Sequence, residues 1–396
     1  MSPANANAGL GRKPLGPLAG LRILEIASIG PGPMAAMLLA DMGADVVRVE
    51  KPGAADIFPL PRRLDITARS RRSLALDLKH PHGLAALRRL LPRFDGLIEG
   101  FRPGAMERLG LAPDDCRAIN PRLVYGRMTG FGQSGPLAQT AGHDLNYLGV
   151  SGILLALGRE GEPPMPPLNL IADYGGGAMF LAFGMVCALL ERERSGLGQV
   201  VDAAMLDGAA VLASLFGSLR AGGLWSERRG DNVLDGGAPF YATYATSDGR
   251  FVAVAALETK FFAELTRRLD LEGRFVRGQY DRALWPELRA RLAAIFATRT
   301  RDEWRAALEG TETCVSGVLS FAEAPDHPQN RARDAYADIG GQIQPAPAPR
   351  FSRSANDRPR PPAEAGANSR DVLWEAGFTT EEIDALLTAG AIAEHG

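Results

Sequence analysis

The sequence predicts an α/β fold in which a Rossmann-like large domain with a parallel sheet precedes a smaller α+β domain. Two observations predict this fold. In the first half of the chain, short apolar runs alternate with helix signals, which is typical of a parallel sheet with helical crossovers. After residue 225, two apolar runs flank the turn Ser247-Asp248-Gly249 instead, which indicates an antiparallel hairpin.

Strands of the large domain are expected at short apolar runs, which cover residues 21–26, 46–50, 74–78, 96–99 and 123–128. Helices are expected between them. One follows the loop Gly30-Pro31-Gly32-Pro33 and covers Met34–Met42, and another covers Pro81–Leu91, with proline in its first turn. A longer apolar helix is expected over Gly175–Arg194.

The same signals divide the chain into five segments. These are a disordered leader (1–16), the large domain (17–205), a connecting helix or linker (206–224), the small α+β domain (225–330), and a C-terminal arm and helix that return to the large domain (331–396). The proline- and arginine-rich residues 342–362 are expected to form an extended arm without regular structure. The last helix is expected to begin with a capping box of Thr379 and Glu382 and to end at Gly390.

Size and charge exclude several classes of function. A chain of 396 residues can bury two sizeable cores, and its net charge of −2 gives no general attraction to nucleic acid or to an anionic membrane. The longest apolar run, Met179–Leu190, is too short to span a bilayer. The three cysteines lie far apart, so we expect no disulfides, no metal site and a cytoplasmic location.

His143 and Asp173 are the candidate catalytic pair. His143 is one of only five histidines, and Asp173 follows about thirty residues later in an apolar, glycine-rich stretch. A histidine can give or take a proton near neutral pH, and a carboxylate supplies a second group of a different type. Inversion of a carbon centre is easiest with one such group on each face. The residues alone leave open a structural hydrogen bond for His143 and a helix N-cap for Asp173.

The loop after the first strand resembles a dinucleotide-binding motif. Gly30-Pro31-Gly32-Pro33-Met34-Ala35 fits the pattern G-x-G-x-x-A, and Glu50 ends the next strand at a suitable spacing. However, Pro31 and Pro33 have no N–H group, so the loop lacks donors that a pyrophosphate needs. We therefore expect these glycines to allow tight packing of strand and helix, and not to bind NAD or FAD.

Many longer motifs occur in a fixed order between about Gly16 and Pro362. They include GPLAGLRILEIASIGPGPMAAMLLADMGADVVRVEKP, SLALDLK, EGFRPGAMERLGL, RMTGFGQSGP, GHDLNY, PPLNLIADYGGG, GQVVDAAM and LDGGAPFY. With these motifs the chain is similar to the family III CoA-transferases, and within them it closely resembles the α-methylacyl-CoA racemases. The resemblance implies the family III CoA-transferase fold. It also implies an interlocked homodimer whose active site combines the large domain of one subunit with the small domain of the other.

The resemblance implies roles for individual residues. His143 and Asp173 fall at the positions of the two catalytic bases, and Glu258 falls at the position of a glutamate that orients the histidine. The implied CoA-binding residues are Lys51, Leu76, Asp77, Leu78, Lys79, Gly100, Phe101, Arg102, Arg108, Gly142, Asp144, Asn146 and Tyr147.

The implied activity is an isomerase of lipid and fatty-acid metabolism. It interconverts the C2 epimers of 2-methylacyl-CoA thioesters by 1,1-proton transfer through an enolate, with acyl-CoA as substrate and no cofactor. In the transferase branch the aspartate at position 173 is a nucleophile, so CoA transfer between carboxylic acids is the alternative. The histidine at position 143 favours the racemase. An inactive CoA-binding or scaffold protein is a third possibility.

Two further sets of residues suit this chemistry. Gly175, Gly176 and Gly177 are expected either to offer backbone N–H groups to the enolate or to allow close approach of the ligand. Guanidinium groups pair well with phosphate oxygens, so a basic stretch is expected either to hold the phosphates of CoA or to form a solvated loop. It contains Arg62, Arg63, Arg69, Arg71 and Arg72.

Overall fold

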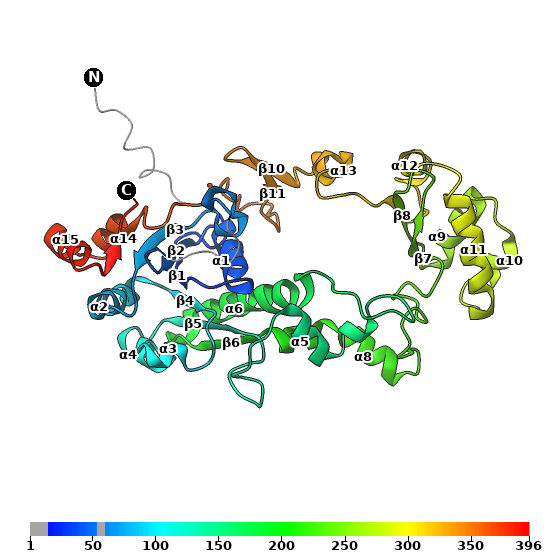
Figure 1. Cartoon of the computed structure of the whole chain (residues 1–396). Coiled ribbons are helices and arrows are strands. Elements are labelled where there is room, and N and C mark those ends of the chain that lie inside the picture. Colours follow the sequence, from blue (N-terminus) through cyan, green and yellow to red (C-terminus); the bar gives the residue numbers. More distant parts are fainter. Residues whose placement is uncertain (1–14, 54–59, 396) are drawn as a thin grey trace, which may run out of the picture. The chain divides into compact units, whose positions relative to one another are not determined.

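The computed structural model describes residues 15–53 and 60–395 (Figure 1). Of the expected disordered leader, residues 1–14 lie outside the described residues. The chain forms two compact units. The first contains the chain up to Ser151, Leu168–Leu212 and the chain from Asp334 on, and the second contains Gly152–Pro167 and Ala213–Arg333.

A mainly parallel sheet is the centre of the first unit. In the described part of the chain its strand order is β12-β3-β2-β1-β4-β5-β6, and only β12 runs antiparallel to its neighbour. The strand order reverses between β1 and β4, so their carboxyl ends form a topological switch point, where α/β sheets usually bind ligands. The strands are β1 (Arg22–Ile26), β2 (Asp45–Glu50), β3 (Arg72–Leu76), β4 (Gly96–Glu99), β5 (Val124–Thr129), β6 (Val200–Ala204) and β12 (Ile392–Ala393).

The structure confirms the expected α/β fold with its parallel sheet and its smaller antiparallel part. The five expected strands are β1 to β5, and β3 begins two residues earlier than expected, at Arg72. The sequence did not reveal β6 or β12. β6 contains an aspartate and two alanines, which have low strand propensity, and β12 has only two residues.

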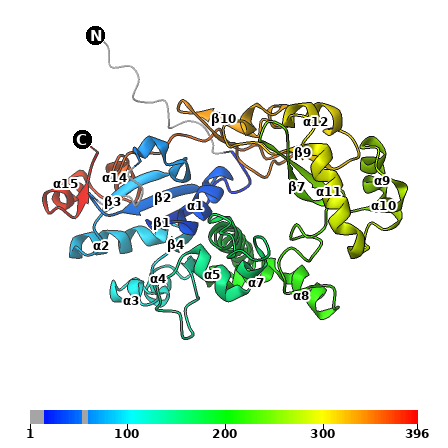
Figure 2. The same ribbon diagram turned by 45° about the vertical axis from the view of Figure 1, so that its right-hand side comes forward.

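Helices cover both faces of this sheet (Figures 1 and 2). α1 (Pro31–Asp41) and α6 (Met179–Ser195) lie on one face. α6 lies close to the strands because β5 has a glycine at position 126, where a side chain would overlap Met185. The other face is covered by α2 (Pro81–Leu90), α14 (Ser369–Glu375) and α15 (Thr380–Thr388), whose apolar side chains share one core with the strands.

The remaining helices of the first unit lie in the loops between strands. They are α3 (Ala105–Arg108), α4 (Pro113–Ile119), α5 (Asp144–Ser151), η5 (Leu170–Ala178) and α7 (Met205–Leu212), with 3-10 turns at Arg62–Leu64, Ile66–Ala68 and Leu91–Arg93.

The helix that carries Asp173 is longer than expected. A π-helical segment, η5, leads directly into α6, so the helix runs from Leu170 to Ser195. By length and composition alone this helix is apolar enough to cross a membrane, a test that the core helices of soluble proteins also pass. It packs against β5, β6, α1 and α7, and its outer side exposes Met179, Phe183 and Leu190.

The second unit contains an antiparallel sheet of β7 (Tyr241–Ala245), β8 (Phe251–Ala255) and β9 (Val315–Gly317). β7 and β8 confirm the expected hairpin around the turn Ser247-Asp248-Gly249. Aromatic residues, among them Phe240, Phe262 and Trp285, fill the core beside it. The helices of this unit are η4 (Leu154–Ala156), α8 (Ser214–Ala221), α9 (Thr259–Arg268), α10 (Gly273–Arg277), η6 (Arg282–Leu284), α11 (Trp285–Phe296), α12 (Arg301–Leu308), η7 (Ala324–Asp326) and α13 (Pro328–Ala332).

The C-terminal arm has more regular structure than the sequence suggested. The expectation of an extended arm over 342–362 is wrong at its start, because β11 (Gln342–Pro345) pairs with β10 (Tyr336–Ile339) in a hairpin. The sequence did not indicate this strand for two reasons. The segment is rich in proline, and the one deeply buried side chain of the strand, Gln344, is polar and not apolar. The capping box of Thr379 and Glu382 is confirmed at the start of α15.

Arg69 fastens this arm to the large domain. Its guanidinium is 2% exposed and donates to both carboxylate oxygens of Asp41 at the end of α1. The same group donates to the side chain of Gln344 and to the carbonyl of Pro345 in β11. A buried arginine with this set of partners ties together two segments that are 275 residues apart.

We predict that Arg69→Ala lowers the free energy of unfolding by about 3–5 kcal/mol, because it leaves the carboxylate of Asp41 buried without its partner. Urea unfolding followed by circular dichroism measures the change. Arg63→Ala is the matched control, since Arg63 is exposed, and we expect it to change stability by about 0.5 kcal/mol or less. Equal stabilities of the two variants would contradict the role of Arg69 in fastening the arm to the large domain.

Candidate active site

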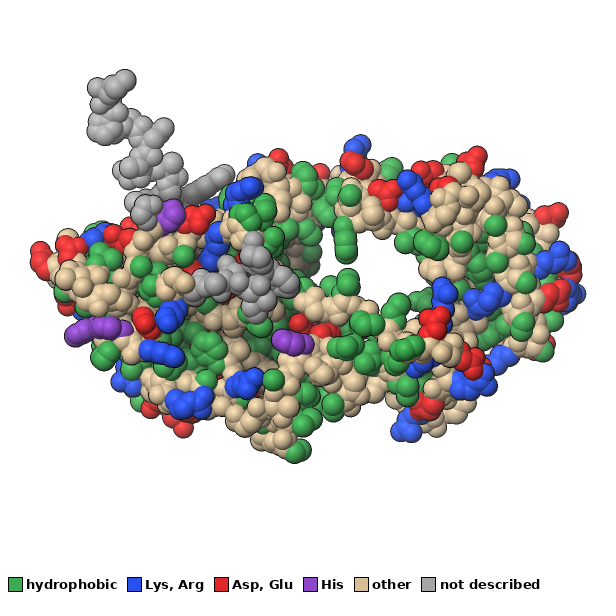
Figure 3. All heavy atoms as spheres, viewed as in Figure 1, with side chains coloured by type: hydrophobic (Ala, Val, Ile, Leu, Met, Phe, Trp, Pro, Cys, Tyr) green, Lys and Arg blue, Asp and Glu red, His purple; other side chains and the backbone are tan. Residues whose placement is uncertain are grey.

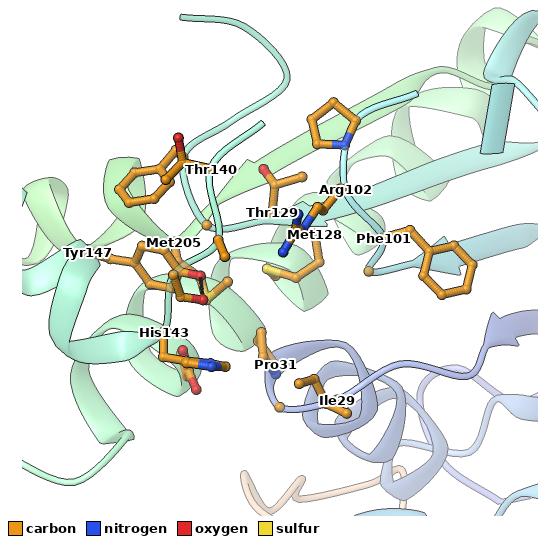
Figure 4. A pocket seen from close by; sticks show the side chains of 18 of the residues that line it. Ile29, Pro31, Phe101, Arg102, Met128, Thr129, Thr140, His143, Tyr147 and Met205 are labelled. Atoms are coloured by element: carbon orange, nitrogen blue, oxygen red, sulfur yellow. Dashed lines mark hydrogen bonds between the residues drawn. The ribbon is translucent and has the colours of Figure 1, made fainter. Parts of the chain in front are cut away.

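A cavity of about 280 Å³ lies at the topological switch point (Figure 4). We call it the reaction pocket. Three loops at the carboxyl ends of strands line it: Ile29–Pro31 after β1, Gly100–Pro103 after β4, and Met128–Phe131 at the end of β5. His143, Tyr147, Asp173 and Met205 also line it, together with Ala138 and residues 140–142. The two candidate catalytic residues therefore border one cavity.

A second cavity, of about 330 Å³, lies at the ends of β1, β2 and β3, and we call it the β1–β3 pocket. Ile29 and Phe101 line both cavities, so the two pockets are neighbours along the same edge of the sheet. The expected CoA-binding residues divide between them. Lys51, Leu76, Asp77, Leu78 and Lys79 line the β1–β3 pocket, whereas Gly100, Arg102, Gly142 and Tyr147 line the reaction pocket.

His143 lies directly before α5, and its position is held by local hydrogen bonds. Its backbone N–H donates to the side-chain oxygen of Asn146 at 3.0 Å. The hydroxyl of Tyr147 donates to the carbonyl of Gly142, and the buried ring of Tyr147 packs edge-on against Phe131. The imidazole itself is exposed and extends toward Ile29 and Pro31 in Figure 4.

Asp173 lies in the π-helical segment η5 and has an unusual carboxyl group. Partial burial raises its pKa to about 6, and the nearby charge of Asp144 adds to this effect. A long hydrogen bond from Asn169, at 3.4 Å, and the charge of His143 act in the opposite direction. The resulting pKa is close to the ordinary pKa of histidine, about 6.5.

Asp144 holds the backbone that carries Asp173. Its buried carboxylate accepts the N–H of Ala172 at 3.0 Å and the N–H of Asp173 at 3.3 Å. Burial raises the pKa of Asp144 as well, against the effect of these two hydrogen bonds. The side chain of Asp144 therefore serves η5 and does not line either pocket.

The glycines after Asp173 allow two helices to touch. A side chain at Gly176 would overlap the backbone of α7 near Ala209, and one at Gly208 in α7 would overlap the carbonyl of Gly176. Gly177 packs in the same way against Met205. The expectation that these glycines approach the ligand or present free N–H groups to it is therefore wrong, because they lie inside η5 and face neighbouring helices.

Four of the five arginines that were expected to bind the phosphates of CoA form ion pairs within the first unit. They form ion pairs with acidic residues of the sheet and of α1, and these pairs are Arg62–Glu50, Arg69–Asp41, Arg71–Glu25 and Arg72–Asp45. The phosphate-binding interpretation is wrong for these four. The exposed cations that do border the pockets are Lys51, Lys79 and Arg102, within the described part of the chain.

Besides Asp144, three more of the expected site residues line neither pocket. Arg108 is exposed at the end of α3 and folds back against Gly104. Asn146 holds the backbone of His143. Glu258 belongs to the second unit, where it directly precedes α9 and its carbonyl accepts the N–H groups of Phe261 and Phe262. Its action on the histidine stays a prediction.

Several pocket residues were not identified from the sequence. The apolar wall contains Ile29, Pro31, Met128 and Met205, and Asn169 donates to Asp173. A signal was available for one of them: the loop Gly30-Pro31-Gly32-Pro33 combined two glycines and two prolines at a strand end, and we interpreted it only as a packing device.

We predict that Asp173→Asn stabilises the protein at neutral pH. The folded-state pKa of Asp173, about 6, is above its value of about 3.9 in an unfolded chain, so ionisation costs stability as the pH rises from about 4 through 6. Because the group is partly exposed, we expect a gain of only about 1–2 kcal/mol at pH 7. Urea unfolding at a series of pH values measures it.

The control for this prediction is Asp270→Asn, which changes an exposed aspartate. The difference between that variant and the unmodified chain should not change with pH. An advantage of Asp173→Asn that is the same at pH 4 and pH 7 would contradict the raised pKa.

Known proteins are similar to this chain over most of its length. A family model described as CoA-transferase family III matches residues 18–368. The α-methylacyl-CoA racemase of Mus musculus is 47% identical over 369 residues, which covers 92% of this chain and 95% of that protein. The human α-methylacyl-CoA racemase is 44% identical over 371 residues, with the same coverage.

More distant relatives include a transferase and a solved structure. Succinyl-CoA--D-citramalate CoA-transferase of Chloroflexus aurantiacus is 30% identical over 400 residues, covering 96% of this chain and 98% of that protein. The crystal structure of a CaiB/BaiF family protein from Brucella suis has a TM-score of 0.77 and 27% identity, covering 91% of this chain and 100% of the other. The chain therefore belongs to the CoA-transferase family III.

Proposed function

We infer that the chain is an isomerase that interconverts (2R)- and (2S)-2-methylacyl-CoA thioesters by 1,1-proton transfer. The observation that carries this inference is that His143 and Asp173, two proton-transfer groups of different type, border one pocket. Two α-methylacyl-CoA racemases at 44–47% identity support the same activity. The reaction needs no cofactor, because the thioester itself acidifies the C2 proton.

The two groups act in turn. In one direction the carboxylate of Asp173 removes the C2 proton and protonated His143 delivers a proton to the opposite face, and in the other direction the roles are exchanged. The pKa of Asp173, which is raised to about 6, lies close enough to neutral pH for this carboxyl group both to take up and to release a proton. This suits a reaction that must run in both directions.

The intermediate is an enolate, and its negative charge needs stabilisation. Each pKa unit between the C2 proton and the base costs about 1.4 kcal/mol, so the thioester oxygen must be bound by hydrogen-bond donors. α5 begins at Asp144, directly after His143, and the N–H groups of Asn146 and Tyr147 donate to the carbonyl of His143. The N–H groups of Asp144 and Leu145 are therefore the proposed donors to the thioester oxygen. They take the place of the glycine N–H groups that the sequence suggested.

Acyl-CoA is long enough to occupy both pockets. We propose that its thioester lies in the reaction pocket and its nucleotide in the β1–β3 pocket, where Lys51 and Lys79 supply positive charge for phosphate. Figure 3 shows basic and acidic side chains interspersed on the visible face, without a broad basic field. This supports a small-molecule substrate, and not nucleic acid, as the partner. A cytoplasmic location is part of the proposal, since the three cysteines are free.

The proposed activity predicts deuterium exchange. When (2R)-2-methylacyl-CoA is incubated with the enzyme in D₂O without any acceptor acid, proton NMR should show deuterium entering C2 while the two epimers approach equal amounts. His143→Gln and Asp173→Asn should each slow this exchange by about 10²–10⁴-fold, because each removes one proton-transfer group. His82→Gln, which changes an exposed histidine at the start of α2, should leave the rate unchanged.

Two results would contradict the racemase. If C2 keeps its proton but CoA moves to an added carboxylic acid, Asp173 is a nucleophile, and hydroxylamine should then trap it as an acyl derivative. If neither exchange nor transfer occurs while acyl-CoA still binds, the chain is a binding or scaffold protein.

We propose that the protein is a homodimer. In the first unit, Met179, Phe183 and Leu190 are each more than half exposed and recur at helical spacing on α6. Val211 and Leu212 at the end of α7 are exposed as well. Large apolar side chains grouped in this way usually mark an interaction surface. A second copy of the chain would cover the exposed apolar face of α6, which contributes to the high hydropathy of the helix from Leu170 to Ser195.

We predict that the chain sediments at about twice its mass of 42.2 kDa, and that Phe183→Glu shifts it toward the monomer by placing a charge in the interface. Analytical ultracentrifugation measures this shift. Trp374→Glu is the control, because Trp374 is 68% exposed on α14, which covers the other face of the sheet from α6. A monomeric chain, or one recovered with membranes, would overturn the proposed dimer.

A further inference from the structure

We propose that Pro31 is a positioning residue for catalysis, which keeps the carboxylate of Asp173 free of backbone hydrogen bonds so that it acts as a proton acceptor. This inference rests on the racemase function proposed above. It gives the loop Gly30-Pro31-Gly32-Pro33 a part in positioning the catalytic carboxylate. The loop resembles a dinucleotide-binding motif, but we assign it no dinucleotide.

The carboxylate of Asp173 lies against the start of α1. A Cβ atom built on Gly30, the N-cap of α1, would be 3.5 Å from Oδ2 of Asp173. The ring of Pro31 packs on the same segment, with its Cβ 3.2 Å from the position of a Cβ on Gly177, one turn beyond Asp173. Pro31 therefore stands between the first turn of α1 and the catalytic segment.

A helix start normally offers free N–H groups, and a carboxylate placed there is stabilised by hydrogen bonds and by the helix dipole. α1 departs from this pattern. Pro31 and Pro33 have no N–H, and the N–H of Met34 donates to the carbonyl of Gly30 at 3.3 Å. Of the first three residues of α1, Gly32 is thus the one with a backbone N–H.

The other groups around Asp173 do not replace these donors. From η5, Asn169 gives the long bond of 3.4 Å. From α5 and the residue before it, His143 and Asp144 act by charge, and Tyr147 lies within range of the Asp173 charge. The loop after β4 adds Arg102 to the same pocket, whereas α1 and α7 contribute pocket residues that do not titrate, within the part of the chain that the structure describes.

The consequence concerns the two chemistries of the family. A carboxylate that accepts hydrogen bonds at a helix start is a weaker base. A carboxylate left against apolar atoms holds its proton more readily, as the pKa of about 6 for Asp173 shows. Proton transfer in both directions requires the second kind. The proline at position 31 therefore favours proton exchange at this aspartate.

The test restores the missing N–H. Pro31→Ala and Pro31→Val both add a donor at the first position of α1, and valine keeps bulk over Gly177. For each variant, kcat/KM of epimerisation is measured against pH in both directions. We expect the acid limb to move down by roughly one pH unit and the plateau to fall several-fold, equally in both directions because the overall equilibrium is unchanged. Pro113→Ala is the matched control, since it removes the first-turn proline of α4, and its profile should match that of the unmodified enzyme.

A second measurement does not depend on catalysis. The chain is labelled with [4-¹³C]aspartate, and the Asp173 signal is identified by its loss in Asp173→Asn. Its titration midpoint should move to lower pH in both Pro31 variants and not in Pro113→Ala. An unchanged midpoint together with an unchanged pH profile means that Pro31 only packs against η5, and overturns the proposal. Absence of exchange in the unmodified enzyme would instead reject the racemase, while the midpoint would still test Pro31.

Discussion

The site depends on the close contact between η5 and α7, where the backbone of Gly176 lies against the backbone of Gly208. This contact leaves no room for a side chain on either residue, so it fixes the distance and rotation of the two helices. η5 carries Asp173, and α7 begins with Met205, which lines the same pocket. The wide π-helical turn is a rare geometry that recurs at functional sites. Here it is held by packing on one side and by Asp144 on the other.

The cost of this arrangement is a pair of acidic side chains close together and partly buried. Asp144 raises the pKa of Asp173, and its own carboxylate is satisfied by backbone N–H groups. One carboxylate is thus held by hydrogen bonds, while the other is left nearly without them. This difference separates a structural acid from a reactive one within 30 residues of sequence, and it explains how two similar side chains in one site do different work.

Most of the fold could be predicted from the sequence, because β1 to β5 are apolar runs separated by helices. The strands that were missed carry little apolar signal: β6 contains Asp202, and β12 has two residues. Within the site, His143 and Asp173 were singled out by residue type and position, and the motif match gave them their roles. Asn169 and Pro31 were not found, because the sequence shows neither the π-helical segment that brings Asn169 to Asp173 nor the contact of Pro31 with Gly177. The prediction that the arginines bind phosphate was wrong for a related reason. The sequence does not show whether a guanidinium group faces solvent or an interior carboxylate such as that of Asp41.

The interior arginines are neutralised by carboxylates, so the positive charge available to a ligand comes from other residues. Arg62, Arg69, Arg71 and Arg72 are paired with carboxylates of the sheet and of α1, so they add rigidity without adding a field at the pockets. The exposed cations that border the pockets, among the residues that the structure describes, are Lys51, Lys79 and Arg102. Because exposed lysines are held by a flexible stem, they can follow a phosphate group that reaches the surface. The pair of Arg62 with Glu50 fixes the carboxyl end of β2 beside the β1–β3 pocket, so in the proposed binding mode the exposed cations adapt to the ligand while this edge of the sheet stays in place.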